Sequence, residues 1–245
     1  MNLLLDLGNS RLKWAMRDGA LQDGRALSYG EDFPAVLDHA FAALAKPARV
    51  VVASVAGTER NDALAGWLKA HWGLAPEFIV PRSRQCGVTS SYDEPARLGA
   101  DRWAALIAAW ARTASAACVV DAGTAVTVDV LDATGVFRGG VILPGLSLQR
   151  AALLRGTREI SAAGEGGGSC LALNTADAVS GGMHYGLAGA IDRILDEQAA
   201  VLGVAPRVLL TGGDSEPLLP LLRHRVEHIP QLVLEGVGCI AEESA

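Results

Sequence analysis

Two short acidic phrases have residue types and a spacing that suit chemistry. In DLGNS, Asp6 follows an apolar run and precedes Gly8, and in DAGT, Asp121 follows a second apolar run and precedes Gly123. A glycine at such a turn lets several backbone N–H groups converge on a phosphate, and neighbouring hydroxyl and amide side chains add donors. The carboxylate cannot touch a phosphate directly, but it can hold a hydrated cation that does. Either phrase alone is typical of an ordinary turn, whereas two in matching positions indicate a pair of loops around a nucleoside triphosphate and its cation.

The phrase RLGADRW places a carboxylate and a guanidinium side by side at the start of a predicted helix. Asp101 is suited there to capping the helix. Arg102 is a poor choice for a first helical turn, because the helix macrodipole disfavours a cation at that end. The pair also suits a reaction in which Asp101 takes a proton from a hydroxyl group while Arg102 binds an anionic group of the substrate. The residues alone leave capping and catalysis equally open.

The elements that must position these residues repeat along the chain. In the first half, the patterns predict strands at 2–7, 11–17, 20–29, 48–55 and 77–80, and helices at 33–45, 59–71 and 101–115. In the second half they predict strands at 118–121, 126–131, 137–143, in RVLLTGGD and at 226–229, and helices from 146, over 176–202, before 226 and in LVLEGVGCIAEE. We therefore expect an α/β fold of two duplicated domains, 1–115 and 116–245, with a cleft between the two acidic hairpins.

Composition narrows the class of protein. The chain has 245 residues, half of them hydrophobic and a fifth charged, which is typical of a globular protein. Its net charge of -6 argues against a nucleic-acid surface, since phosphate backbones need a cationic field. The four cysteines are scattered without metal-ligand spacing, which favours a reduced, cytoplasmic setting. We expect no signal peptide and no membrane-spanning segment.

Several phrases in one order give the chain a family resemblance. The duplicated hairpins and the late Gly-Gly turn resemble the ATPase superfamily of actin, the sugar kinases and the heat-shock ATPases. Within it, the chain is most similar to the type III pantothenate kinases, through DLGNSRLKW, YDEPARLGADRWAAL, VVDAGTAVTVD, GGVILPGL, LNTADAVSGG, LLTGGD and PQLVLEGV. The resemblance implies two ribonuclease H-like, actin-like ATPase domains. It also implies ATP-dependent phosphorylation of pantothenate to 4′-phosphopantothenate, the first step of coenzyme A biosynthesis.

The resemblance also implies roles for individual residues. The general base is expected to be Asp101. Substrate contacts are expected at Tyr92, Gly99, Ala100, Asp101, Arg102 and Thr175, and ATP contacts at Asp6, Leu7, Gly8, Asn9, Ser10, Arg11, Leu12, Lys13 and Thr124. A monovalent cation, potassium or ammonium, is expected on Asp121, and Mg²⁺ near Asp6 through a water molecule. The family forms homodimers whose pocket is lined by both subunits.

Plainer interpretations stay open beside these roles. Tyr92 also suits an aromatic side chain that covers the core from a loop, and Thr175 suits a helix N-cap as well as a substrate contact. Ser10 stands where the family usually has threonine, but the hydroxyl is retained. Trp103 and Trp110 share one helix face, which fits either a subunit contact or the core of one chain. The stretch GEGGGSC lacks the Gly-Lys-[Ser/Thr] of a P-loop, so we expect a simple loop there.

Two rival functions remain. A different member of the same superfamily, such as a sugar kinase or another kinase with a different acceptor, an acetate-type kinase or an exopolyphosphatase, would share both phosphate loops. The phrase YDEPARLGADRW on the acceptor side favours pantothenate. A transcription-accessory relative of the same family would share the fold, but the acidic net charge and the presence of Asp6, Asp101, Arg102 and Asp121 disfavour it.

Overall fold

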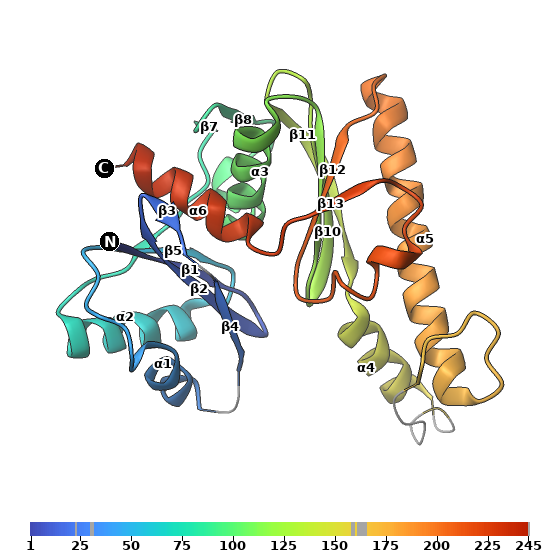
Figure 1. Cartoon of the computed structure of the whole chain (residues 1–245), viewed down its shortest axis with the longest axis horizontal. Coiled ribbons are helices and arrows are strands. Elements are labelled where there is room, and N and C mark those ends of the chain that lie inside the picture. Colours follow the sequence, from blue (N-terminus) through green and yellow to red (C-terminus); the bar gives the residue numbers. More distant parts are fainter. Residues whose placement is uncertain (23, 30–31, 158–159, 161–165, 245) are drawn as a thin grey trace. The chain divides into compact units, whose positions relative to one another are not determined.

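The computed structural model describes residues 1–22, 24–29, 32–157, 160 and 166–244 (Figure 1). It forms two compact units, of which unit 1 comprises Met1–Arg112 with Gln231–Ala245, and unit 2 comprises Thr113–Pro230. Part of the expected third strand, at Asp23, and part of the expected glycine-rich loop, at Gly164 and Glu165, lie outside the described residues.

Unit 1 is built around one mixed sheet in the order β3-β2-β1-β5-β6, with β4 also paired to β2. The central strand β1 runs antiparallel to β2 and parallel to β5. The strands are β1 (Asn2–Leu7), β2 (Arg11–Asp18), β3 (Ala20–Leu21), β4 (Arg25–Ser28), β5 (Val50–Ser54) and β6 (Glu77–Phe78). The helices of this unit are α1 (Phe33–Phe41), α2 (Thr58–Trp72), α3 (Ala100–Thr113, in this unit to Arg112) and α6 (Leu232–Glu243).

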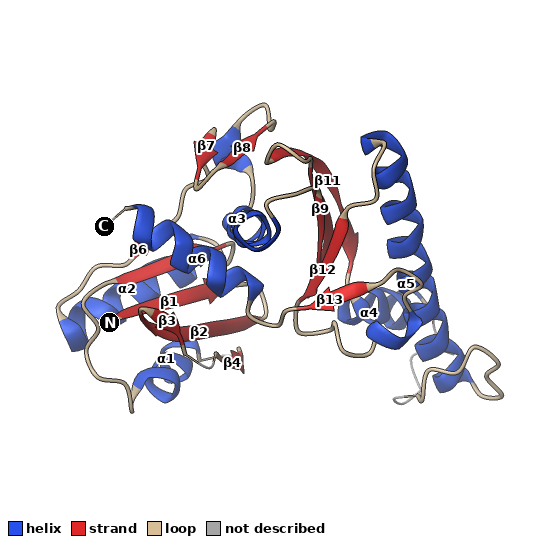
Figure 2. Ribbon diagram, turned by 45° about the horizontal axis from the view of Figure 1, so that its top comes forward, coloured by secondary structure: helices blue, strands red, loops and turns tan. Residues whose placement is uncertain are grey.

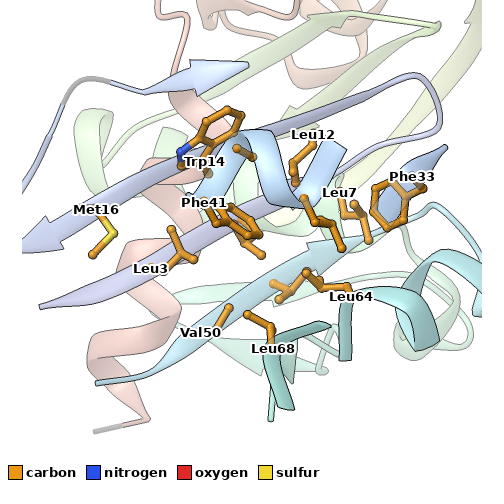
Figure 3. Packing of buried hydrophobic residues seen from close by; sticks show 14 residues of the cluster. Leu3, Leu7, Leu12, Trp14, Met16, Phe33, Phe41, Val50, Leu64 and Leu68 are labelled. Atoms are coloured by element: carbon orange, nitrogen blue, oxygen red, sulfur yellow. The ribbon is translucent and has the colours of Figure 1, made fainter. Parts of the chain in front are cut away.

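Side chains along β1 and β2 point alternately to the two faces of this sheet, and helices cover both faces. Leu3, Leu5 and Leu7 point to the face covered by α1 and α2, where they pack against Phe41 and Leu64 (Figure 3). The helix α6 contacts β1, β2 and β5, and Figure 2 shows it on the opposite face from α1. Asp6 therefore sits in a strand that is buried on both sides.

Helix α6 packs closely against α3 within unit 1. A Cβ atom on Gly236 would overlap the backbone of Ala104, so the two helices approach at a point where only glycine fits. The sequence placed residues 231–245 with the second domain, whereas they pack with the first unit. Their apolar side chains are buried there, from Leu232 to Ala241. A division of the duplicated halves at residue 115 stays a prediction.

A small hairpin, β7 (Arg84–Gln85) and β8 (Val88–Ser90), lies in the segment expected to be a loop. Trp103 is fully buried, and its Nε1 donates a hydrogen bond to Gln85 Oε1 at 2.9 Å. The indole Nε1 of Trp110 lies against Gly87, 2.8 Å from where a Cβ atom would stand. Trp103 therefore belongs to the core of the chain, whereas the half-buried Trp110 leaves both interpretations open.

Unit 2 has the same plan as unit 1. Its strands lie in the order β13-β12-β9-β10-β11, with β9 antiparallel to β10 and parallel to β12. The elements are β9 (Ala117–Ala122), β10 (Ala125–Leu131), β11 (Val136–Pro144), α4 (Leu146–Gly156), α5 (Thr175–Leu202), β12 (Arg207–Thr211) and β13 (Val226–His228). The long helix α5 covers one face of this sheet, where Leu187 and Ile191 meet Val128 (Figure 2).

The prediction of a helix before residue 226, in unit 2, is wrong. Before β13 the chain makes only a 3₁₀ turn, Leu219–Leu221. Pro217 and Pro220 stand in this segment, and a proline inside a helix removes a backbone donor and clashes with the preceding turn. The expected α/β class is confirmed, and in each unit an antiparallel hairpin is joined by a parallel strand.

Candidate active site

The first acidic turn joins β1 to β2 in unit 1. Asp6 is the penultimate residue of β1 and is buried, and it lies opposite Lys13 in the strand register. Lys13 Nζ stands 3.3 Å from Asp6 Oδ2. A buried carboxylate needs such a partner, because removing a charge from water is costly. The turn is closed by a hydrogen bond from Gly8 N to Arg11 O at 3.1 Å, and Asn9 and Ser10 at its tip are exposed.

The second acidic turn joins β9 to β10 in unit 2, at the equivalent place. Asp121 is again the penultimate residue of its strand, and it is half-buried. Gly123 N donates to Ala125 O at 3.1 Å and closes the turn. Gly145 N donates to Thr124 O at 3.0 Å, and a side chain on Gly145 would overlap the backbone of Gly123. The start of α4 is therefore fastened to this turn.

The turn after β12, in LLTGGD, is fastened to the same place. Asp214 N donates to Ala122 O at 2.8 Å, and Thr211 lies beside Asp121 in the parallel register of β12 and β9. Gly212 has a φ of +99°, and a Cβ atom there would overlap the backbone of Ala122. This turn and the second acidic turn therefore form one structure within unit 2.

A serine–histidine pair that the sequence did not single out braces this turn. Ser215 is buried, and its Oγ donates to Gly212 O at 2.7 Å. His228 Nε2, on β13, lies 2.8 Å from the same Oγ. Since the serine proton is directed to Gly212, the histidine acts as the donor to Ser215. The pair holds the backbone and is not arranged as an activated nucleophile.

The phrase RLGADRW begins α3. Helix α3 starts at Ala100, so Asp101 lies inside the first turn and not at the N-cap position. Asp101 Oδ1 nevertheless accepts the Arg102 N–H at 2.7 Å, which supports the helix start. A Cβ atom on Gly99 would lie 2.5 Å from that same oxygen. Glycine at this position therefore leaves room for the Asp101 carboxylate, and this explains the spacing Gly-x-Asp.

The neighbours of Asp101 differ in exposure. Arg102 is buried, at 9% exposed, whereas Asp101 is half-buried. Tyr92 belongs to the same unit, between β8 and the 3₁₀ turn Pro95–Arg97, and its side chain is 38% exposed. This partial exposure is compatible with either expected role of Tyr92, packing from a loop or contact with a substrate.

Thr175 is the first residue of α5 in unit 2 and is exposed. The suggestion that it caps the helix is wrong, because the cap is Asn174, whose side chain accepts the Asp177 N–H at 2.9 Å. Hydrogen bonds from Gly167 N–H and from the Asn174 amide hold the pKa of Asp177 below its usual value. The Thr175 hydroxyl is left with no hydrogen-bond partner within the described part of the chain.

Unit 1 thus contains Asp6–Lys13, Tyr92 and Gly99–Arg102, and unit 2 contains Asp121, Thr124 and Thr175. Across the described ranges, no three or more His, Cys, Asp or Glu side chains are grouped to hold a metal ion. Nor does any helix in those ranges have the length and apolar character needed to cross a membrane.

Comparison with known proteins gives one consistent family. A family model described as type III pantothenate kinase matches residues 2–197. The type III pantothenate kinase of Alkalilimnicola ehrlichii is 44% identical over 245 residues, covering 99% of this chain and 98% of its own length. Among solved structures, a Sinorhizobium meliloti protein assigned as a 2-dehydro-3-deoxygalactonokinase has a TM-score of 0.61 at 17% identity, covering 99% of this chain and 96% of its own. A Campylobacter jejuni protein assigned to the Baf family of transcriptional activators has a TM-score of 0.58 at 22% identity, covering 99% and 98%.

Proposed function

The chain belongs to the type III pantothenate kinase family, and we propose that it transfers the γ-phosphoryl group of ATP to pantothenate, forming 4′-phosphopantothenate for coenzyme A biosynthesis. The observation that carries this proposal is the full-length match to kinases of this name, together with two glycine turns that follow a carboxylate at equivalent strand ends. The sugar-kinase-like fold agrees with it.

Asp101 is the proposed general base. Its carboxylate takes the proton of the primary hydroxyl of pantothenate as that oxygen bonds to the γ-phosphorus, and the bond from phosphorus to the bridging oxygen of ADP breaks. Gly99 leaves the space in which this carboxylate stands. Arg102, a buried guanidinium beside it, is proposed to bind the pantothenate carboxylate or a phosphate oxygen. Tyr92, Ala100 and Thr175 are proposed as further substrate contacts.

The turn from Asp6 to Lys13 is proposed to bind the ATP phosphates in unit 1, and Thr124 in unit 2. Backbone N–H groups of the first turn and the hydroxyl of Ser10 provide donors. Lys13 provides a positive charge that its pairing with Asp6 keeps at the turn. These groups neutralise charge and fix the geometry, which is most of what phosphoryl transfer requires.

Two cations belong to the proposal, Mg²⁺ and a monovalent ion, potassium or ammonium. Asp121 fits the monovalent ion, since a half-buried carboxylate at a strand end supplies hard oxygen ligands. Asp6 fits Mg²⁺ less directly, because Lys13 already shares its carboxylate, so it would act through a water molecule. When bound, the cations add positive charge around the transferred phosphoryl group.

A homodimer is also proposed. Helix α4 has no buried residue among those described, and Leu148 on it is 42% exposed. Figure 1 shows the segment before α5 beside the first turns of α5. In this segment Leu171 is 85% exposed and Leu173 is 99% exposed. Large apolar side chains this exposed are typical of surfaces that a subunit contact covers.

A cytoplasmic location is the last part of the proposal. All four cysteines are free in the structure, and cysteines in that state are typical of a reducing compartment.

The likeness to a protein assigned to transcriptional activators concerns the fold alone, at 22% identity. The net charge of -6 disfavours direct DNA contact. The kinase interpretation therefore takes precedence over the regulatory one.

The test is ADP release by the purified protein with ATP and Mg²⁺, in potassium and in sodium salts. We expect ADP release that requires pantothenate and does not occur with glucose or acetate, and no phosphate release from polyphosphate. ADP release with glucose or acetate in place of pantothenate, or phosphate release from polyphosphate, would contradict the assignment.

A further inference from the structure

The carbonyl groups of the first acidic turn are all held from outside the turn. Tyr29 Oη donates to Gly8 O at 3.0 Å, and Arg60 Nη1 donates to Asn9 O at 3.0 Å. The backbone N–H of Tyr29 donates to Ser10 O at 3.0 Å. Two residues, Tyr29 after β4 and Arg60 on α2, therefore fix three consecutive peptide units. The sequence patterns singled out neither of them.

Fixing these carbonyl groups also fixes the N–H groups of the turn. A trans peptide unit is planar, and its C=O and N–H point in opposite directions. Holding Gly8 O, Asn9 O and Ser10 O toward Tyr29 and Arg60 therefore directs the N–H groups of residues 9, 10 and 11 the other way. Such N–H groups are the donors with which a backbone turn binds phosphate. No carbonyl oxygen of this run is left to face an anion.

Tyr29 is well suited to remain a donor. Its ring packs edge-on against Phe33 at 5.2 Å between centroids, and Figure 3 shows Phe33 beside Leu7 in the core. Burial raises the pKa of the Tyr29 phenol above its ordinary value, the nearby Arg60 lowers it and the Asp6 carboxylate raises it further. The net direction is upward, so the hydroxyl keeps its proton and its hydrogen bond to Gly8 throughout the physiological range.

Arg60 is difficult to explain by helix energetics alone. It lies in the first turn of α2, whose N-cap, Gly57, makes no side-chain capping bond. A cation at a helix N-terminus is disfavoured by about 0.3–1 kcal/mol. Its guanidinium instead lies over the Tyr29 ring, 4.5 Å from the centroid, while bonding to Asn9 O. Arg60 therefore stabilises the acidic turn, although its charge slightly destabilises the start of α2.

We propose that Tyr29 and Arg60 are positioning residues for the ATP phosphates, which hold residues 8–11 in the conformation that binds them. This inference rests on the proposed ATP site at Asp6–Lys13. It predicts an effect on the polyphosphate part of the nucleotide, and none on adenosine or pantothenate.

The test compares Tyr29→Phe, Arg60→Leu and Arg60→Lys with the wild-type chain. Dissociation constants are measured for ATP, ADP and adenosine, and KM for ATP and for pantothenate. Tyr29→Phe keeps the ring and loses one hydrogen bond, so ATP and ADP should bind about 5-fold more weakly. Arg60→Leu also loses the charge, and we expect a loss of about 10-fold or more. Arg60→Lys, which keeps a donor, should lie between wild type and Arg60→Leu. Adenosine binding and the KM for pantothenate should not change.

The matched control is Lys69→Met, which removes a cation from the last turn of the same helix and should bind ATP as wild type does. Wild-type ATP binding by folded Tyr29→Phe and Arg60→Leu would overturn the inference, as would equal losses for ATP and adenosine. Lys13→Met separates the two levels of the proposal. If it weakens ATP binding while the Tyr29 and Arg60 variants do not, only the positioning role fails. If it too binds ATP normally, the ATP site itself is misplaced and both fail.

Discussion

Replacing Asp101 by asparagine separates the two roles that a carboxylate at a helix start can have. The amide oxygen of asparagine can still accept the Arg102 N–H that Asp101 Oδ1 accepts at 2.7 Å. At the helix start the substitution removes the interaction of a negative charge with the macrodipole, about 0.3–1 kcal/mol. For a chain of this size that contribution corresponds to a decrease in Tm of up to about 4 °C.

The effect on the reaction should be far larger. An amide cannot take the proton of the attacking hydroxyl, and a positioned acid–base group contributes about 10²- to 10⁴-fold to the rate. This equals about 2.7–5.5 kcal/mol of activation free energy, several times the expected change in stability. We therefore expect kcat for pantothenate phosphorylation to fall at least 100-fold, with KM for ATP nearly unchanged.

The assay is ADP release at saturating ATP and pantothenate in potassium buffer, with thermal unfolding measured on the same samples. Asp32→Asn is the matched control, because Asp32 caps α1 in the same unit by accepting the Ala35 N–H at 3.1 Å. It should lose a similar small amount of stability and no activity. If Asp101→Asn retained kcat within about 3-fold of wild type and behaved like Asp32→Asn, Asp101 would support the helix and the base would be another group.

Three further predictions test other parts of the structure. Asp121→Asn should remove most of the difference between turnover in potassium and in sodium, and a potassium activation equal to wild type would place the monovalent ion elsewhere. Gly212→Ala adds a Cβ atom at a φ of +99° against the Ala122 backbone. The free energy of unfolding should therefore fall by about 1–3 kcal/mol, which lowers the Tm by several degrees. An unchanged Tm would mean that the turn adjusts without strain. The Leu173 side chain is 99% exposed in a single chain, and Leu173→Ser should shift the protein from dimer toward monomer in sedimentation-velocity measurements. Val201→Ser is the control, because Val201 is 86% exposed at the other end of α5 and its replacement should not change the oligomeric state.

The predictable parts of the fold are the elements that local sequence patterns indicate. The strand that carries Asp121 and the helix that carries Asp101 follow from apolar runs and helical spacing, and the structure has them within a few residues. The acidic turns were found because a carboxylate and a glycine stand two positions apart in both phrases. Their chemical roles came from the family resemblance and remain proposals, since the residues alone left capping and catalysis open.

What local patterns missed are partners brought together by the fold. Tyr29 and Arg60 reach the first turn from separate elements, and neither is part of a recognisable motif. Ser215 and His228 meet only because β13 pairs with β12. The return of α6 to unit 1 depends on the close approach of Gly236 to α3, which no periodicity reports. Each contact joins residues that are far apart in the sequence. Periodicity is analysed in short windows along the chain, so it does not detect such contacts.

The two acidic turns share a position but have different neighbours, and this difference assigns them different work. Lys13 stands opposite Asp6 in the register of β1 and β2, whereas Thr127 stands opposite Asp121 in that of β9 and β10. A lysine 3.3 Å from the first carboxylate offsets its charge, which supports the proposed phosphate-binding role of that turn. Threonine, at the equivalent register position, brings no charge of its own to the second turn. We propose that the first turn binds phosphate through Lys13 and its backbone donors and that Asp121 in the second turn binds the monovalent cation, and the potassium dependence of Asp121→Asn tests that assignment.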